Sequence, residues 1–193
     1  MNGDGTQIVT SLRTVRDFHV EVAKLLTAAT STMGNHNWFV PSRSIACGSN
    51  SSKAVGYARY WLVEDAFQFY RNDNDNSRLA YISIVLDDVE KPSKVKVPFI
   101  SAGFLRFALG GPGANGELVY GWCRLALENV PDVQLDGQWR NVSVQQIDKT
   151  GKYQIEEART MSRPLLQIER ESDLKSLIVT PLLDLLSGNE LQF

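Results

Sequence analysis

The sequence predicts an α+β fold: a mostly antiparallel sheet of about four to six strands, with an N-terminal helix pair and C-terminal helices packed on it. Apolar residues recur at helical spacing in the first part of the chain, and the period changes to two from Arg78 onward. The links between the first expected strands are too short for parallel crossovers. With 193 residues, 43% of them hydrophobic and 22% charged, the chain is predicted to form one domain over residues 1–193.

The N-terminal helix pair is predicted at Thr6–Met33 and at Val55–Arg71. The first helix has a single apolar stripe at three- and four-residue steps, made by Leu12, Val15, Val22, Leu26, Ala29 and Met33. Gly34 and Asn35 form its expected end. The second helix is apolar around more than half of its surface, with Tyr60, Val63, Phe67 and Tyr70 on one face and Tyr57 and Trp61 beside it.

The first expected strand follows Arg78 and is apolar on both faces, which is typical of a central strand: Ala80, Ile82, Ile84 and Leu86 alternate with Leu79, Tyr81, Ser83 and Val85. A second strand is expected at Val95–Phe99. Pro98 cannot donate to a strand ladder, which places that strand at an edge or in a bulge. Residues 99–109 fit either a strand or a short helix. Further strands are expected at Glu117–Leu127, Trp139–Ile147, Lys152–Ile155 (after a hairpin turn at Asp148–Gly151) and Leu165–Ile168.

A C-terminal helix is predicted to begin at Thr180. Thr180 is a typical N-cap and Pro181 is suited to the first helical position, while Gly188 is expected to end the helix. Leucines at 182, 183, 185 and 186 supply its apolar face. This helix completes the expected packing on the sheet.

Composition excludes several classes of function. The net charge is −2 without a polybasic block, which argues against nucleic-acid binding. Two cysteines, Cys47 and Cys123, are too few for a secreted disulfide scaffold. The sequence has neither the pattern of a signal peptide at Met1 nor an apolar run long enough for a membrane span. We therefore expect a cytoplasmic protein without a membrane partner.

The most informative feature is aromatic crowding, since eight of the chain's 18 aromatic residues lie between Trp38 and Tyr70. Aromatic and arginine side chains are enriched at binding hot spots. The predicted binding residues are Trp38, Tyr57, Arg59, Tyr60 and Trp61. The alternative is that these rings belong to the core. More ring surface than one sheet face covers favours self-association or recognition of a protein partner.

A second hypothesis places a divalent metal at Asp87 and Asp88, which end the apolar strand that follows Arg78. Hard cations such as Mg²⁺ prefer oxygen ligands, and the protein would then be a metal-dependent enzyme acting on a phosphorylated or nucleic-acid substrate. No phosphate-binding Gly-x-x-x-x-Gly-Lys segment accompanies the pair. The alternative is a solvated turn, since strands commonly end in Asp.

Other chemistry receives little support. His19 falls near the apolar stripe of the first helix, while His36 and Cys47 share a loop without the pattern of a known nucleophile. No zinc spacing occurs, no cofactor is predicted, and the sequence leaves open whether a small-molecule ligand binds. We therefore expect a soluble, non-catalytic interaction protein that binds through the loop and helix at residues 38–70, with the metal-dependent enzyme as the alternative.

Overall fold

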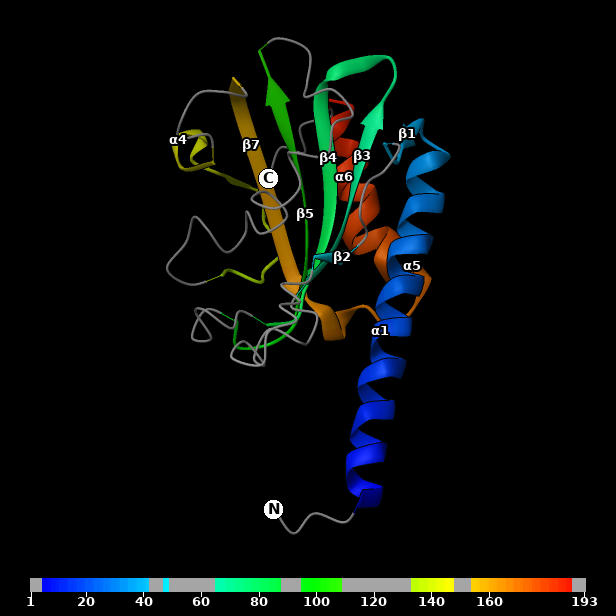
Figure 1. Ribbon diagram of the computed structural model, residues 1–193. Coiled ribbons are helices and arrows are strands. Elements are labelled where there is room, and N and C mark those ends of the chain that lie inside the picture. The colour runs from blue at the N-terminus through cyan, green and yellow to red at the C-terminus, as the bar shows by residue number, and fades with distance from the viewer. Residues whose placement is uncertain are drawn as a thin grey trace.

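The computed structural model describes residues 5–41, 47–48, 65–87, 95–108, 133–147 and 154–188. Within them one antiparallel sheet is covered by helices, which confirms the α+β fold (Figure 1). Neighbouring strands follow the order β1-β3-β4-β5-β7-β6, and β2 also pairs with β3. The strands are β1 (Trp38–Phe39), β2 (Cys47–Gly48), β3 (Asp65–Asn72), β4 (Asp75–Val85), β5 (Phe99–Phe107), β6 (Arg140–Asn141) and β7 (Ile155–Pro164).

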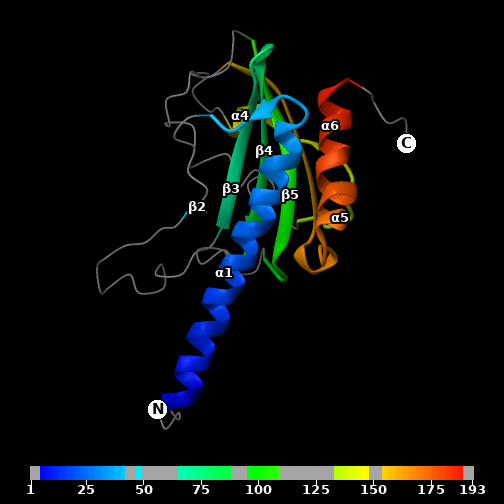
Figure 2. The ribbon, with the colours of Figure 1, turned by 90° about the vertical axis from the view of Figure 1, so that its right-hand side faces the viewer.

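The larger core lies between the sheet and the helices. Helix α1 (Gly5–Gly34) and the C-terminal helical run pack on the same face of the sheet, side by side in two views (Figures 1 and 2). The run consists of α5 (Glu171–Leu174), the π-helical turn η4 (Lys175–Val179) and α6 (Thr180–Leu186). The buried residues of this larger core include Ala29, Met33, Ile82, Ile84, Ile100, Ile178 and Leu182. Burial of these apolar side chains is what holds the helices on the sheet.

The opposite face of the sheet carries a second, aromatic-rich core. It includes Phe67, Phe69, Tyr81, Leu105 and Phe107. Phe67 packs edge-on against Phe69 with ring centroids 5.6 Å apart, and Phe69 packs against Tyr81 at 6.4 Å. The short helix α4 (Val144–Ile147) lies on this side, next to β7 (Figure 1). The central strands β4 and β5 are therefore buried on both faces, as β4 was predicted to be.

The predicted first helix is confirmed within one residue at each end. Its apolar stripe is buried from Val22 to Met33, where α1 crosses the sheet. After Gly34 the chain turns, with Asn37 at a φ of 63°, and enters β1. Asn and Asp tolerate this left-handed conformation better than other non-glycine residues. The turn therefore carries Trp38 back toward the sheet.

The predicted second helix is wrong over Asp65–Arg71, which belong to β3. Its apolar residues, Ala66, Phe67, Phe69 and Tyr70, fall on both alternating faces of the segment, so the pattern fits a helix and a doubly buried strand equally well. Pairing decides in favour of the strand: β3 joins β4 through a two-residue turn at Asp73–Asn74 and pairs along its length. Residues 55–64 of the predicted helix lie outside the described residues.

Three other strand predictions also need correction. Residues 95–98 are not a strand; β5 begins at Phe99 and lies centrally between β4 and β7, so Pro98 precedes the ladder instead of marking an edge. The predicted strand at Trp139–Ile147 is limited to β6, and Val144–Ile147 are helical. Leu165–Gln167 form the 3₁₀ turn η3 instead of a strand. The strand predicted at Glu117–Leu127 and the hairpin turn at Asp148–Gly151 lie outside the described residues.

The C-terminal helix begins earlier than predicted. Asp173 accepts hydrogen bonds from the backbone N–H groups of Glu169 and Arg170 at 3.2 and 2.9 Å, and the helical run starts there. Thr180 is inside the run instead of capping it. The wide π turn ends at Val179, two residues before Pro181, whose ring would clash with the carbonyl four residues earlier in a regular helix. Gly188, at a φ of 76°, ends the run as predicted.

Helix α1 is the longest helix in the described part of the chain. Neither it nor any other helix there has an apolar stretch sufficient to cross a membrane. Its N-terminal half extends beyond the ends of the strands (Figures 1 and 2).

Candidate functional site

The predicted aromatic surface is only partly described. Trp38 lies in β1, 6% exposed, in the core between the helices and the sheet. Tyr57, Arg59, Tyr60 and Trp61 lie outside the described residues, so their role in binding stays a prediction. Trp38 also packs in the same core as Tyr70, which fixes the short strand β1 against β3.

The described rings of this segment do not form one helical ladder. Because β3 is a strand, Tyr70 points to the helix side and Phe67 and Phe69 to the opposite side. Burial raises the pKa of Tyr70 to about 12, although its hydroxyl lies 3.3 Å from the Thr30 hydroxyl of α1, a contact that lowers this pKa. Phe39 is the one exposed ring among the described aromatics of residues 38–70.

The predicted metal site is described at one residue. Asp87 follows β4 by two positions and Asp88 lies outside the described residues. Within the described ranges no three His, Cys, Asp or Glu side chains come together as a metal site would require. The metal-dependent enzyme therefore stays a prediction. His36 is exposed in the turn after α1, and His19 is half-buried on α1.

A row of buried hydroxyls crosses the centre of the sheet on the face away from the helices. Ser83, Ser101 and Ser162 are direct cross-strand neighbours on β4, β5 and β7. Ser101 Oγ lies 2.9 Å from Thr160 Oγ1 and donates to the Met161 carbonyl at 3.1 Å. Ser83 Oγ is buried without a hydrogen-bond partner in the described part of the chain. Sequence reasoning missed this row, although each strand carries serine on the same alternating face.

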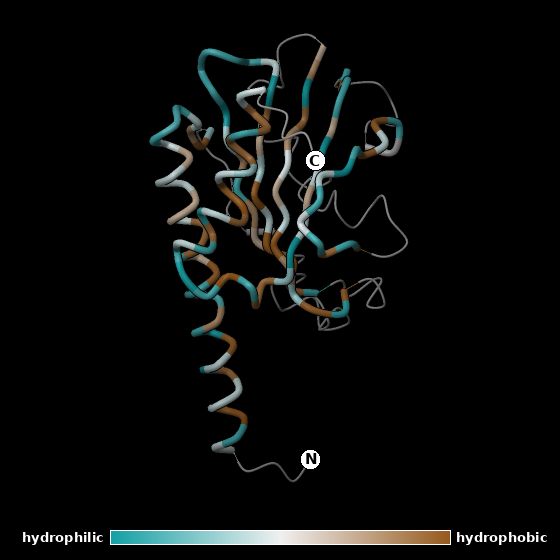
Figure 3. Tube along the Cα trace, turned by 180° about the vertical axis from the view of Figure 1, so that it is seen from behind, coloured by the Kyte–Doolittle hydropathy of each residue, from teal (hydrophilic) through white to brown (hydrophobic). Residues whose placement is uncertain are grey.

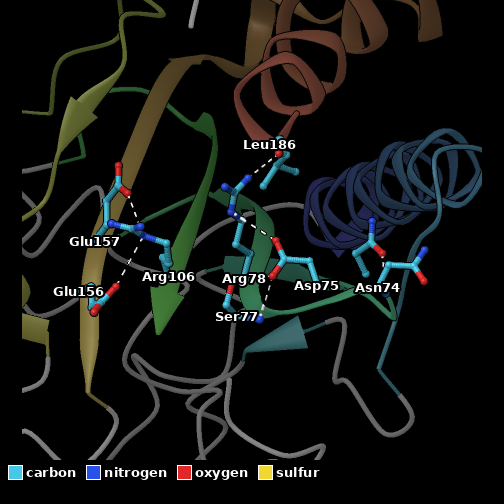
Figure 4. A network of polar contacts seen from close by, with 9 residues as sticks. Asn74, Asp75, Ser77, Arg78, Arg106, Glu156, Glu157 and Leu186 are labelled. Carbon is cyan, nitrogen blue, oxygen red and sulfur yellow. Dashed lines mark hydrogen bonds and ion pairs between the residues drawn. The ribbon is translucent and has the colours of Figure 1, made fainter. Parts of the chain in front are cut away.

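Charged side chains on the helix face of the sheet form ion pairs and hydrogen bonds within the sheet and to α6 (Figure 4). Arg106 Nε lies 3.2 Å from a Glu157 carboxylate oxygen, and Arg159 Nε lies 2.7 Å from the other oxygen of the same carboxylate. Arg78 pairs with Asp75 at 3.4 Å and donates to the Leu186 carbonyl at the end of α6. A cation at a helix C-terminus is electrostatically favourable. This contact ties α6 to β4.

An ion pair between Asp136 and Arg140 stabilises the turn that precedes β6. Arg140 donates two hydrogen bonds to Asp136, at 2.9 and 2.7 Å, and the Gln138 N–H donates a third at 3.0 Å. These bonds, the Arg140 contact first, hold the pKa of Asp136 well below its usual range. The same contact raises the pKa of Arg140. Both side chains are partly exposed, so the pair shapes a surface turn.

The exposed apolar surface of the described chain is concentrated on α1. Of its nine large exposed hydrophobic residues, six lie between Ile8 and Val20 (Ile8, Val9, Leu12, Val15, Phe18 and Val20). Leu12 is 62% exposed and Ile8 is 57% exposed. Figure 3 shows hydrophobic segments recurring along this projecting part of the helix. We call residues 5–20 of α1 the arm.

Four of the six exposed residues form one stripe along the arm. Residues 8, 12 and 15 follow four- and three-residue steps, and residue 18 flanks them. Val9 and Val20 lie within about 20° of each other on another side of the helix, and Val20 is about 130° from the middle of this stripe by the helical period. The arm stripe is defined here as Ile8, Leu12, Val15 and Phe18. It continues the buried stripe that runs from Val22 to Met33.

The arm stripe is therefore the candidate binding surface that the described residues support. The sequence predicts an apolar stripe along the whole of α1. The structure shows that the sheet and the C-terminal helices cover its second half and leave the arm stripe exposed. The chain matches no protein-family model, no curated protein and no solved structure.

Proposed function

We propose that this chain is an interaction protein that self-associates through the arm stripe of α1. The observation that carries the proposal is an apolar helix face left uncovered: every residue from Gly5 to Phe18 is exposed, Ile8 and Leu12 by more than half. Contiguous exposed apolar patches mark interaction surfaces on soluble proteins. A helix with such a face gains stability when another apolar surface covers it.

The helical state of the arm gives a second reason. Isolated helices shorter than about 12–15 residues are marginal in water even when they are rich in alanine. The arm is rich in β-branched residues, such as Ile8, Val9 and Val15, which lower helix propensity. Its first fourteen residues have no buried side chain to compensate. A partner along the stripe would supply the packing that the sheet supplies to the second half of α1.

Charge also favours a protein surface as the occupant. The arm carries Arg13, Arg16 and Asp17 as its charged residues, a nearly balanced set. A strongly basic polar face, which is the usual mark of a helix that lies on anionic lipid or on nucleic acid, is not present on the arm. Apolar contact is therefore the main source of affinity.

Hydrogen–deuterium exchange tests the proposal on the unmodified protein. We expect the amides of residues 8–18 to be protected at high protein concentration and to exchange rapidly after dilution, because the free arm frays. Amides of Val22–Met33 are the internal control, since they pack on the sheet at every concentration. Arm amides that exchange at the same rate at all concentrations would contradict self-association through this face.

A further inference from the structure

The seam of α1 has the spacing of a coiled coil over its whole length. Three- and four-residue steps alternate through Ile8, Leu12, Val15, His19, Val22, Leu26, Ala29 and Met33. The last four positions are buried in the chain's own core, whereas Ile8, Leu12 and Val15 are exposed. The free half of the seam thus continues a packed interface that already exists.

We infer that a second copy of this chain lies antiparallel along the arm, about a two-fold axis between Leu12 and Val15. This inference rests on the proposed function, since it requires the arm stripe to be the self-association surface. In such an isologous pair, Leu12 of each copy contacts Val15 of the other.

The fold favours an antiparallel orientation of the second copy. The face of α1 that is free at Leu12 and Val15 is covered by the chain's own sheet and C-terminal helices from Val22 onward. A parallel helix seated on the arm would continue along this face and enter the space that the sheet occupies. An antiparallel helix would end there instead, and its own folded body would lie beyond the free end of the first arm, which projects away from the sheet (Figure 2).

The register follows from the spacing. Counting Gly5 and His19, the seam positions up to Val22 are 5, 8, 12, 15, 19 and 22. Their steps of three and four residues read the same in both directions, so the reversed seam superimposes on itself. The superposition pairs Gly5 with Val22, Ile8 with His19 and Leu12 with Val15. It also ends each arm where the other copy's core begins, after an overlap of about 26 Å at 1.5 Å per residue.

The flanking side chains fit this register. Phe18 of one copy comes beside Ser11 of the other, which places a large side chain against a small one. Arg16 comes beside Val9, where its methylene groups can cover apolar surface. No two like charges meet along the seam or its flanks in this register. The opposed helix dipoles of the two copies add a favourable contribution.

Distances between like spin labels test both direction and register. Gln7 and Thr14 are one heptad apart and outside the seam, so labels at Gln7→Cys or Thr14→Cys have the same lateral position. Both variants carry Cys47→Ser and Cys123→Ser. The antiparallel pair predicts an axial offset between like labels of about 20 Å at position 7 and about 2 Å at position 14. The Thr14→Cys distance should therefore be clearly the shorter one.

The outcomes separate the two claims. Equal distances at both positions indicate a parallel pair, and a shorter distance at position 7 indicates a shifted register; either result overturns this inference and leaves self-association intact. No dipolar coupling at either position contradicts the proposed function itself. Small-angle X-ray scattering of the unmodified chain gives an independent measurement in case the cysteine-free variants do not fold. The antiparallel pair predicts an elongated dimer with two separated maxima in its distance distribution, and a compact dimer with a single maximum contradicts it.

Discussion

The Tyr81 hydroxyl donates a 2.7 Å hydrogen bond to Thr160 Oγ1, and the two residues are two strands apart. Tyr81 lies on β4 and Thr160 on β7, with Gly103 of β5 as the cross-strand neighbour of both. The tyrosine ring reaches across the space that a side chain at 103 would fill. The central strand therefore needs glycine at this position, and the contact aligns three strands at the middle of the sheet.

Replacing this glycine should destabilise the fold. A Cβ at position 103 would lie 2.7 Å from the Tyr81 ring and closer still to the Arg159 carbonyl oxygen, which belongs to the rigid backbone. We expect Gly103→Ala to lower the free energy of unfolding by about 1–3 kcal/mol, as overpacking typically does. Urea denaturation measures the change. Gly34→Ala is the matched control because nothing lies within 4 Å of its added carbon, and equal stability of the two variants would contradict the close approach.

The hydrogen bond itself can be measured with a double-mutant cycle. Tyr81→Phe should cost about 1 kcal/mol, because Thr160 keeps its contact with Ser101. Thr160→Val removes the same bond from the other side. In the double variant the two losses should not add, and the missing energy, about 1 kcal/mol, is the coupling between the residues. Fully additive losses would show that the two hydroxyl groups do not interact in solution.

Alkaline pH should destabilise the protein through Tyr70. Its pKa is about 12 in the folded state and about 10 in an unfolded chain, so between these values the unfolded state loses the proton first. The stabilisation of the folded state that comes from the raised pKa of Tyr70 is complete below pH 10 and declines as the pH rises toward 12. We expect the unfolding free energy of the wild type to fall by about 1.4 kcal/mol per pH unit more steeply than that of Tyr70→Phe over this range. Parallel pH profiles of the two proteins would contradict a neutral, buried phenol.

Two valines on α1 separate folding from association. Val22 is buried against the core, whereas Val15 is 37% exposed on the same seam. In dilute solution Val22→Ala should lower the unfolding free energy by about 2 kcal/mol, and Val15→Ala by less than about 1 kcal/mol. Thermal or urea denaturation at low protein concentration makes the comparison. A similar loss for both would mean that the sheet or another part of the same chain covers Val15.

The sequence predicts α1 closely because its polar and apolar residues contrast at every turn. In β3 that contrast is missing: Phe67 and Phe69 face one core and Tyr70 faces the other, so the residues satisfy both periods. Pairing with β4, a long-range property, makes the segment a strand. The sequence pattern also misses most of β7, because its small residues and its Glu157–Arg159 pair replace the usual apolar alternation.

The candidate site is predictable only in part for a similar reason. The stripe through Leu12, Val15 and Val22 is visible in the sequence. Which of these residues remains exposed depends on where the sheet ends relative to the helix, and periodicity within α1 contains no such information. In the aromatic segment the sequence suggests a binding surface where the structure has core, because Trp38 and Tyr70 are buried between the helices and the sheet.

Sedimentation equilibrium on two charge variants tests whether the chain self-associates through the arm stripe. Leu12→Glu places a carboxylate within the arm stripe, and Val20→Glu places the same group outside the stripe on the same arm, about 130° from its middle by the helical period, where Val20 is 48% exposed. We predict that the wild type and Val20→Glu form dimers with similar affinity and that Leu12→Glu is monomeric at the same concentrations. A wild type that remains monomeric at all concentrations, or a Leu12→Glu variant that dimerises as well as Val20→Glu, would contradict self-association through the arm.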